Sequence, residues 1–173
     1  QFAFTEDGIY FEIIDGVNTL SLYPSKKEGK TYTVPETVTV IGNNAFDSVS
    51  NLEEVTIPKT VTSIGINLFS NTKNLKKVTI DAEITFLPNF TFTYSSVSEV
   101  ILPETLIEIG RSVFLNAHNL KTITLPSSLK VIGDSCFYNS GLEEIELPDS
   151  VTEIGQAFFY ATNLKKIKLS NNS

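Results

Sequence analysis

The chain has 173 residues, enough for a single domain with a continuous hydrophobic core. Its net charge of −7 argues against nucleic acid as a partner, because such binding relies on Lys and Arg to neutralise phosphates. No run of residues is long and apolar enough to span a membrane, so we expect no membrane insertion. Cys136 is the only cysteine, so stability has to come from packing and not from disulfides.

Residues 1–31 are predicted to form an N-terminal β-hairpin that caps the rest of the chain. Its first strand follows Gly8, and Asp15-Gly16 provides the residue types of a tight two-residue turn. The chain begins at Gln1 without a Met and shows no signal peptide, so we expect a mature product or a piece cut from a longer chain.

Residues 32–173 repeat one pattern in about six coils, which together with the hairpin we interpret as a single domain. Proline recurs at Pro35, Pro58, Pro103, Pro126 and Pro148, glycine follows seven residues later in each case, and a phenylalanine follows four residues after that. The period of 22–23 residues lies in the roughly 20–29 residue range of leucine-rich repeats.

Each repeat is predicted to form one coil of a solenoid. In the second coil, Val55 and Ile57 alternate with polar residues as in a half-buried strand, and Pro58 ends that strand. A second short strand follows, then a glycine that turns the chain, and then a helical or 3₁₀ turn that buries the phenylalanine. Left-handed backbone is expected just before each next strand, at Asn51, Asn74, Asn119, Gly141 and Asn163.

The predicted fold is therefore a leucine-rich repeat solenoid, a short curved right-handed coil of parallel β-strands. The strands would form a concave sheet, with the short second strands and turns on the convex side. Charges beside the strands alternate in sign between coils, as in Glu54, Lys77 and Glu99, which favours this parallel register. We interpret those charges mainly as support for stacking.

The third coil departs from the repeat. Asp81 stands in place of proline, Pro88 in place of glycine, and aromatic residues occupy three positions that other coils leave polar. We predict that these three residues, Phe86, Phe90 and Tyr94, form a protein-contact patch, since interfaces use exposed aromatic anchors. The alternative is that their rings repack against neighbouring coils. The outward residues of the concave sheet are the second candidate surface: Glu54, Thr56, Lys77, Thr79, Glu99, Ile101, Thr122, Thr124, Glu144, Glu146, Lys166 and Lys168.

No residues suggest catalysis, a metal site or a bound cofactor. His118 is the only histidine and has no recognisable catalytic or metal-binding partners, and Cys136 aligns with small core positions of other coils. The C-terminal coil is expected to be open, because Ser170 replaces the proline after the strand at residues 167–169. Continuation of the native chain, a short covering tail or self-association through this coil would each close it.

The repeat resembles the BspA-like, Treponema pallidum-type leucine-rich repeat family, whose signature is approximately L-x-x-V-x-I-P-x-x-V-x-x-I-G-x-x-A-F-x-x-C. The match runs from Tyr32 to Leu169, with small residues in place of the family's last cysteine. The resemblance implies a secreted or cell-surface protein that binds other proteins, including those on host or neighbouring cells. Two alternatives stay open: a structural spacer in a larger surface protein, and a β-helical enzyme acting on polysaccharide.

Overall fold

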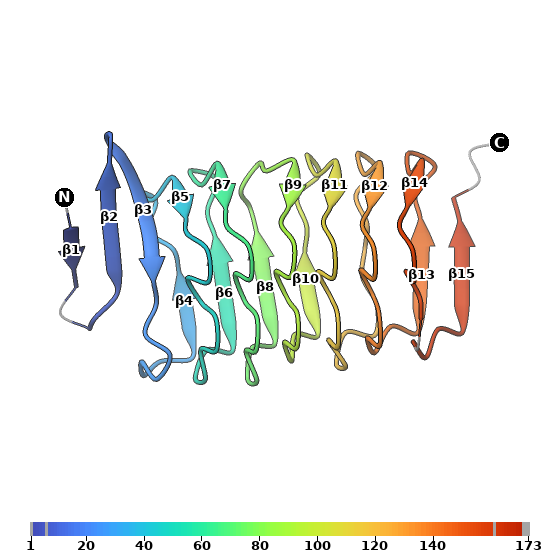
Figure 1. Cartoon of the computed structure of the whole chain (residues 1–173), viewed down its shortest axis with the longest axis horizontal. Coiled ribbons are helices and arrows are strands. Elements are labelled where there is room, and N and C mark those ends of the chain that lie inside the picture. The colour runs from blue at the N-terminus through green and yellow to red at the C-terminus, as the bar shows by residue number, and fades with distance from the viewer. Residues whose placement is uncertain (1, 6, 161, 171–173) are drawn as a thin grey trace.

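The chain folds into a solenoid of about seven turns whose strands follow one another along a single axis (Figure 1). The computed structural model describes residues 2–5, 7–160 and 162–170. Those residues contain strands and turns and no helix. The prediction of a parallel solenoid is confirmed. The prediction of a helical or 3₁₀ turn after each glycine is wrong, because hydrogen-bonded turns stand at these positions.

The N-terminal hairpin is formed as predicted. Strand β1 (Phe2–Phe4) pairs antiparallel with β2 (Tyr10–Ile14), which pairs antiparallel with β3 (Val17–Leu22). The turn between β2 and β3 has positive φ at both Asp15 (51°) and Gly16 (80°), the backbone of a type I′ turn. Strand β3 also pairs in parallel with the first coil, so the hairpin shares one ladder with the solenoid. The boundary at residue 31 stays a prediction.

The solenoid has two strand-bearing sides. We call the first the long-strand face; it contains β4 (Thr31–Thr33), β6 (Glu54–Ile57), β8 (Lys77–Ile80), β10 (Glu99–Ile101), β13 (Glu144–Leu147) and β15 (Lys166–Leu169). We call the second the short-strand face; it contains β5 (Val40–Ile41), β7 (Ser63–Ile64), β9 (Phe86–Leu87), β11 (Glu108–Ile109), β12 (Val131–Ile132) and β14 (Glu153–Ile154). Coils are numbered from β4, so that coil three begins at β8 and coil six at β13.

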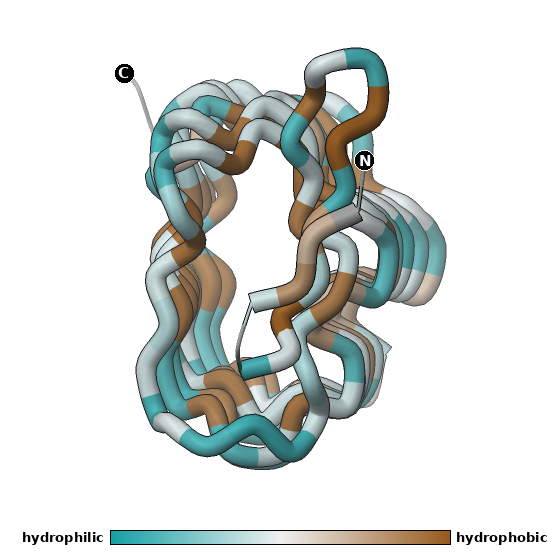
Figure 2. Tube along the Cα trace, turned by 90° about the vertical axis from the view of Figure 1, so that its left-hand side faces the viewer, coloured by the Kyte–Doolittle hydropathy of each residue, from teal (hydrophilic) through white to brown (hydrophobic). Residues whose placement is uncertain are grey.

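A column of aromatic rings fills the centre of the solenoid. Phe46, Phe69, Phe92, Phe114 and Phe137 are buried, and neighbouring centroids lie 5.2–5.4 Å apart. Tyr23 begins this column one period earlier, 5.2 Å from Phe46. Viewed down the solenoid axis, successive coils lie over one another, and hydrophobic positions recur at similar places in each coil (Figure 2).

The prediction that Phe159 is the core phenylalanine of coil six is wrong. Phe158, one residue earlier, is buried and meets Phe137 edge-on at 5.4 Å, while Phe159 is only half-buried. Two adjacent phenylalanines are available for one core position in this coil. The rings are stacked as far as Phe137, and the next ring, Phe158, is turned edge-on.

Backbone hydrogen bonds also join the turns of neighbouring coils, and we call this set the turn ladder. The Phe46 N–H donates to the Leu68 carbonyl at 3.1 Å, and the Phe69 N–H donates to the Thr91 carbonyl at 2.8 Å. The residues two before and two after the core phenylalanine donate in the same way. These flanking residues have positive φ, as does Ala157 in coil six: Asn44, Ser48, Asn67, Asn71, Phe90, Tyr94, Ser112, Asn116, Ser135 and Asn139.

The left-handed backbone predicted at Asn51, Asn74, Asn119 and Gly141 is therefore wrong, because positive φ lies in the turn ladder instead. In these turns, residues with positive φ alternate with residues that do not have it, and several of their N–H groups donate to carbonyls of the next coil. Asn163 likewise is not among the positive-φ residues.

The repeated glycines after Gly42 serve close packing, which corrects the predicted turning role. A Cβ atom on Gly65 would lie 2.4 Å from the Asn43 backbone nitrogen of the coil before, and φ at Gly65 is not positive. The Gly65 N–H also donates to the Ile41 carbonyl at 2.9 Å. Pro88 occupies this position in coil three, carries a ring and has no N–H. The short-strand face accordingly divides between β7 and β9 into two sheets.

The long-strand face divides at a different place, in coil five. Residues 122–125, where the repeat predicts a strand, form none, and in Figure 1 only the short-strand arrows β11 and β12 lie between β10 and β13. The short-strand face stays continuous here from β11 through β12 to β14. Coil five therefore remains in the stack, with Ile123 and Leu125 buried, while its segment on the long-strand face forms no backbone hydrogen bond to either neighbouring coil over residues 122–125.

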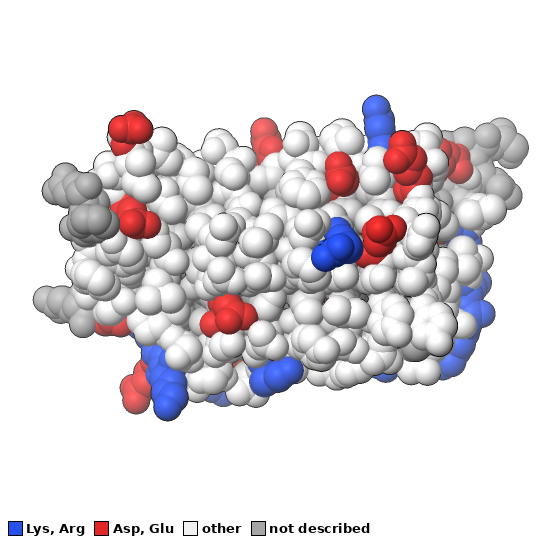
Figure 3. All heavy atoms as spheres, in the orientation of Figure 1, with Lys and Arg blue, Asp and Glu red and all other residues white. Residues whose placement is uncertain are grey.

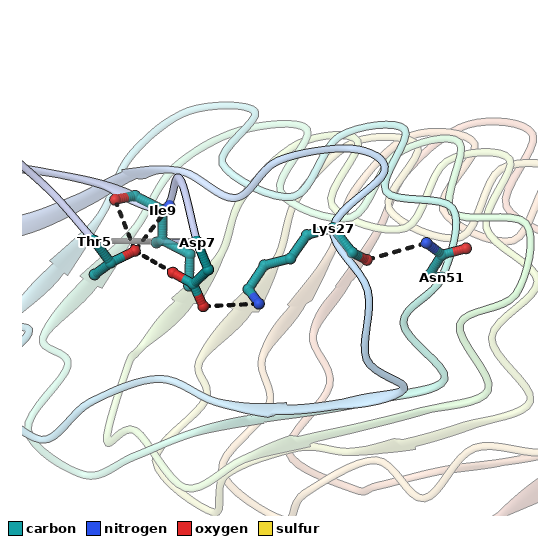
Figure 4. A network of polar contacts seen from close by, with 5 residues as sticks. All are labelled: Thr5, Asp7, Ile9, Lys27 and Asn51. Carbon is teal, nitrogen blue, oxygen red and sulfur yellow. Dashed lines mark hydrogen bonds and ion pairs between the residues drawn. The ribbon is translucent and has the colours of Figure 1, made fainter.

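A polar network fastens the hairpin to the first two coils (Figure 4). Asp7 forms an ion pair with Lys27 at 2.8 Å and accepts a hydrogen bond from the Thr5 hydroxyl. The Asn51 side-chain amide donates to the Lys27 carbonyl at 3.1 Å. The segment after β3 is thus held from both sides, which positions Tyr23 at the head of the aromatic column.

Candidate interaction surfaces

Coil three places aromatic residues at both left-handed positions of its turn. Phe90 has φ of 62° and Tyr94 has φ of 57°, where every other coil has Asn, Ser or Ala. Bulky residues are uncommon at positive φ because their Cβ crowds the backbone. The turn ladder holds them there: the Phe90 N–H donates to the Arg111 carbonyl at 3.0 Å and the Tyr94 N–H to the Leu115 carbonyl at 2.8 Å.

A cation lies over each of these two rings. The Arg111 guanidinium is 5.2 Å from the Phe90 centroid, and the Lys73 ammonium is 5.6 Å from the Tyr94 centroid. Lys73 also donates to the Tyr94 carbonyl at 2.9 Å. Tyr94 is 48% exposed and Phe90 is half-buried, so the two rings are ordered and reach solvent.

Phe86 belongs to a different side of the coil. It lies in β9, is 41% exposed and pairs in register with Glu108 on the short-strand face. The three predicted aromatic residues therefore share one coil but divide into a turn pair, Phe90 and Tyr94, and a strand residue. Figure 3 shows one face of the molecule, on which charged side chains are sparse across the middle and gather toward the edges and ends.

The predicted long-strand residues form two separate groups. Register places Glu54, Lys77 and Glu99 side by side in one row, and Thr56, Thr79 and Ile101 in the next. The second group pairs Glu144 with Lys166 and Glu146 with Lys168. Thr122 and Thr124 lie between the groups and belong to no strand. The face is therefore not the continuous sheet that the repeat predicts.

Ion pairs follow the coils beside this face. Glu53 lies between Lys30 at 2.8 Å and Lys76, and Glu143 lies between Lys165 at 2.8 Å and Lys121 at 3.6 Å. The Lys30 and Lys76 ammonium groups lower the pKa of Glu53 to about 2 from its ordinary value of 4.5. Lys165, with a smaller contribution from Lys121, lowers the pKa of Glu143 in the same way. The expected support of stacking by alternating charge is visible in these pairs.

Acid should remove the contribution of Glu53 to stability. Because its pKa is lowered on folding, this contribution is complete above the ordinary pKa near 4.5 and is lost as pH falls toward 2. We expect Glu53→Gln to lower the Tm at pH 7 and to differ little from wild type near pH 2, in thermal unfolding followed by circular dichroism. Glu36→Gln is the control, since Glu36 forms no ion pair among the described residues. An equal Tm difference at both pH values would contradict the assignment.

The side chains with catalytic or metal-binding potential are isolated from one another. Within the described residues, no three His, Cys, Asp or Glu side chains are grouped as a metal site would need. His118 is exposed in a turn, and Cys136 is buried in the core, where desolvation raises the pKa of its thiol. No helix in the described part of the chain is long and apolar enough to cross a membrane.

Sequence reasoning missed two features of these surfaces. The first is the left-handed pair of positions, for which the recurrence of Asn and Ser two residues either side of the phenylalanine was an available signal. The second is the opening beside residues 122–125, where cavities of about 290 and 410 Å³ lie on either side of coil five. The repeat pattern is intact there, so the residues themselves gave little sign of it.

The family model for the BspA type leucine-rich repeat region matches the chain six times, over residues 23–139 and 85–173. The chain belongs to this family. The match begins at Tyr23, where the aromatic column also begins. No curated protein sequence matches the chain significantly.

Solved structures of bacterial leucine-rich repeat proteins share this BspA-type solenoid. One from Bacteroides ovatus is 30% identical, with a TM-score of 0.74, and the alignment covers 90% of this chain and 41% of that protein. One from Eubacterium ventriosum is 25% identical, with a TM-score of 0.75, covering 95% and 50% respectively. A leucine-rich cell surface protein from Faecalibacterium prausnitzii is 26% identical, with a TM-score of 0.65, covering 100% and 55%. The chain thus spans about half the length of these relatives.

Proposed function

We propose that this chain is a non-catalytic protein-binding module of a secreted or cell-surface protein, and that coil three supplies its anchor residues. The family and the cell-surface relative from Faecalibacterium prausnitzii support a surface location. The observation that carries the proposal is the presence of two aromatic residues at left-handed positions. A protein on a host or neighbouring cell is the kind of partner that this function implies.

Backbone strain is the first step of the argument. A left-handed conformation costs an L-residue roughly 1–2 kcal/mol, and Asn carries less of this cost than bulky residues. Phe90 and Tyr94 therefore weaken a turn that the neighbouring coils build with Asn or Ser. Strained residues of this kind concentrate at functional sites, where the side chain is needed for something other than folding.

The chemistry of the turn pair is the second step. Protein interfaces are enriched in aromatic residues and in Arg, and their binding energy concentrates in a few such anchors. Arg111 and Lys73 hold the Phe90 and Tyr94 rings in place through cation–π contacts, so less side-chain freedom is lost when a partner binds. An ordered, partly exposed aromatic pair beside cations is thus suited to contact a protein surface.

The test measures stability and binding on the same variants. We expect Phe90→Asn and Tyr94→Asn to leave the free energy of unfolding unchanged or to raise it by up to about 1 kcal/mol, because relief of strain offsets the lost ring contacts. Peptides selected from a random phage-displayed library on the wild-type chain should lose most of their affinity for both variants. Tyr160→Asn is the control, since it removes a 64% exposed ring from another coil.

Two results would contradict the proposal. A loss of more than about 1 kcal/mol in both Asn variants would show that the rings serve to stabilise a diverged coil. Unchanged peptide binding in both variants would favour the alternative function, a spacer within a larger surface protein. Phe86→Ser, which restores the residue type of Ser63, separately tests whether the strand residue belongs to the patch.

A further inference from the structure

The long-strand face opens at coil five, and the opening exposes backbone polar groups. Within the described residues, Thr122, Ile123, Thr124 and Leu125 form no backbone hydrogen bond. Among the described residues, two backbone hydrogen bonds link the start of this segment to coil six, from Glu143 N–H at 2.8 Å and Glu144 N–H at 3.5 Å to the Lys121 carbonyl, and the Lys121 ammonium pairs with Glu143 at 3.6 Å. Strand β13 thus pairs with β15 on one edge and leaves its other edge unpaired.

The opening also reaches the apolar core. Val100, Leu102, Ile123 and Leu125 are 7–9% exposed, whereas Val55, Ile57, Val78 and Ile80, their counterparts in coils two and three, are at most 2% exposed. Cavities of about 290 and 410 Å³ flank the segment. Free N–H and C=O groups beside accessible apolar side chains are what an extended peptide uses when it adds to a sheet edge.

Carboxylates surround the opening. Glu99 and Glu104 line the smaller cavity, and Glu144 and Glu146 line the larger one. Neither Glu144 nor Glu146 has an ion-pair partner in the described part of the chain. Lys166 and Lys168 also line the larger cavity, but β15 lies on the far edge of β13 from coil five. Glu99 pairs with Lys77 at 3.1 Å and Lys121 pairs with Glu143 at 3.6 Å, so carboxylates outnumber cations around the opening without being the only charges there.

We propose that this opening binds an extended, basic segment of a partner protein, whose backbone reaches residues 122–125 and the free edge of β13. The chain itself shows the matching chemistry. Strand β8 carries Lys77 between Glu54 and Glu99, and β15 carries Lys166 and Lys168 beside Glu144 and Glu146. A segment with lysines followed by an alternating apolar and polar run, as in residues 75–80 of the chain, would complete the same pattern. This site is separate from the aromatic pair of coil three.

Two peptides copied from the chain provide a matched pair of probes. Residues 75–80 read Leu-Lys-Lys-Val-Thr-Ile and residues 52–57 read Leu-Glu-Glu-Val-Thr-Ile, so they differ only at two positions, where one has Lys and the other Glu. We expect the first peptide, acetylated and amidated, to shift the NMR amide resonances of residues 122–125 and 145–147. The second peptide should bind at least tenfold more weakly. Glu144→Gln/Glu146→Gln should weaken the basic peptide several-fold while Phe90→Asn leaves its affinity unchanged.

Hydrogen exchange of the free protein tests the opening itself. The amides of residues 122–125 should exchange at least tenfold faster than those of Val78, Thr79 and Ile80, which lie inside a continuous sheet. Equal protection would overturn the proposal by showing a closed sheet. Equal affinity for the two peptides, no binding of the basic one, or shifts confined to coil three would overturn it as well, without bearing on the aromatic pair.

Discussion

Replacing Phe114 by alanine is expected to lower the free energy of unfolding by about 3–5 kcal/mol, the usual cost of emptying a buried aromatic position. Phe114 is fully buried in the centre of the aromatic column. Its ring centroid lies 5.3 Å from that of Phe92 and 5.2 Å from that of Phe137. The loss therefore removes contacts with both neighbouring coils at once. In a solenoid each coil contacts only its neighbours, so no distant part of the molecule can compensate.

Phe159→Ala provides the comparison at the equivalent repeat position. Because Phe159 is half-buried and stands beside the column, we expect a loss of only about 1 kcal/mol. Guanidinium unfolding of both variants would give the two values, with an unchanged m-value as the condition for comparing them. Equal losses would mean that coil six uses Phe159 as its core residue after all.

Replacing Gly65 by alanine should cost about 3 kcal/mol or more, although it adds only one methyl group. The added Cβ would meet the backbone nitrogen and Cα of Asn43 at 2.4 and 2.6 Å. These are backbone atoms that cannot rotate away, so coils one and two would have to separate. The change would also strain the hydrogen bond from the Gly65 N–H to the Ile41 carbonyl.

Gly42→Ala is the matched control, because Gly42 occupies the same repeat position in coil one. A Cβ there would lie 3.5 Å from its nearest neighbours, which is ordinary contact, and φ at Gly42 is not positive. We expect a change within about 0.5 kcal/mol, measured by the same unfolding experiment. Similar losses at Gly42 and Gly65 would contradict the close-packing role and point to a conformational role for glycine at this position.

The repeat in the sequence predicts the course of the chain well and its interruptions poorly. The repeat spacing places most of the strands and the central phenylalanines of coils one to five, and the residue types of Asp15-Gly16 place the hairpin turn. Close approach between coils cannot be derived in this way. Gly65 was expected to turn the chain, and only the distance to Asn43 shows that it makes room for a neighbour.

The two candidate surfaces show the same limit. Aromatic residues at positions 86, 90 and 94 stand out in the sequence, so an unusual third coil was predictable, but the left-handed backbone beneath Phe90 and Tyr94 was not. In coil five the pattern Thr122-Ile-Thr-Leu125 has the alternation of a strand, and yet no strand forms. Strand pairing depends on the position of the neighbouring coils, which the residues of one coil do not determine.

The two interruptions lie in different coils, and the turn ladder crosses both. Between coils two and three, where the short-strand sheet divides, the Asn67, Phe69 and Asn71 N–H groups still donate to coil three. Between coils five and six, Ser135, Phe137 and Asn139 do the same. A pulling force applied at the two ends of the solenoid would thus meet backbone hydrogen bonds at each of these junctions. Both junctions therefore keep backbone hydrogen bonds along the solenoid axis, although a different sheet is interrupted at each.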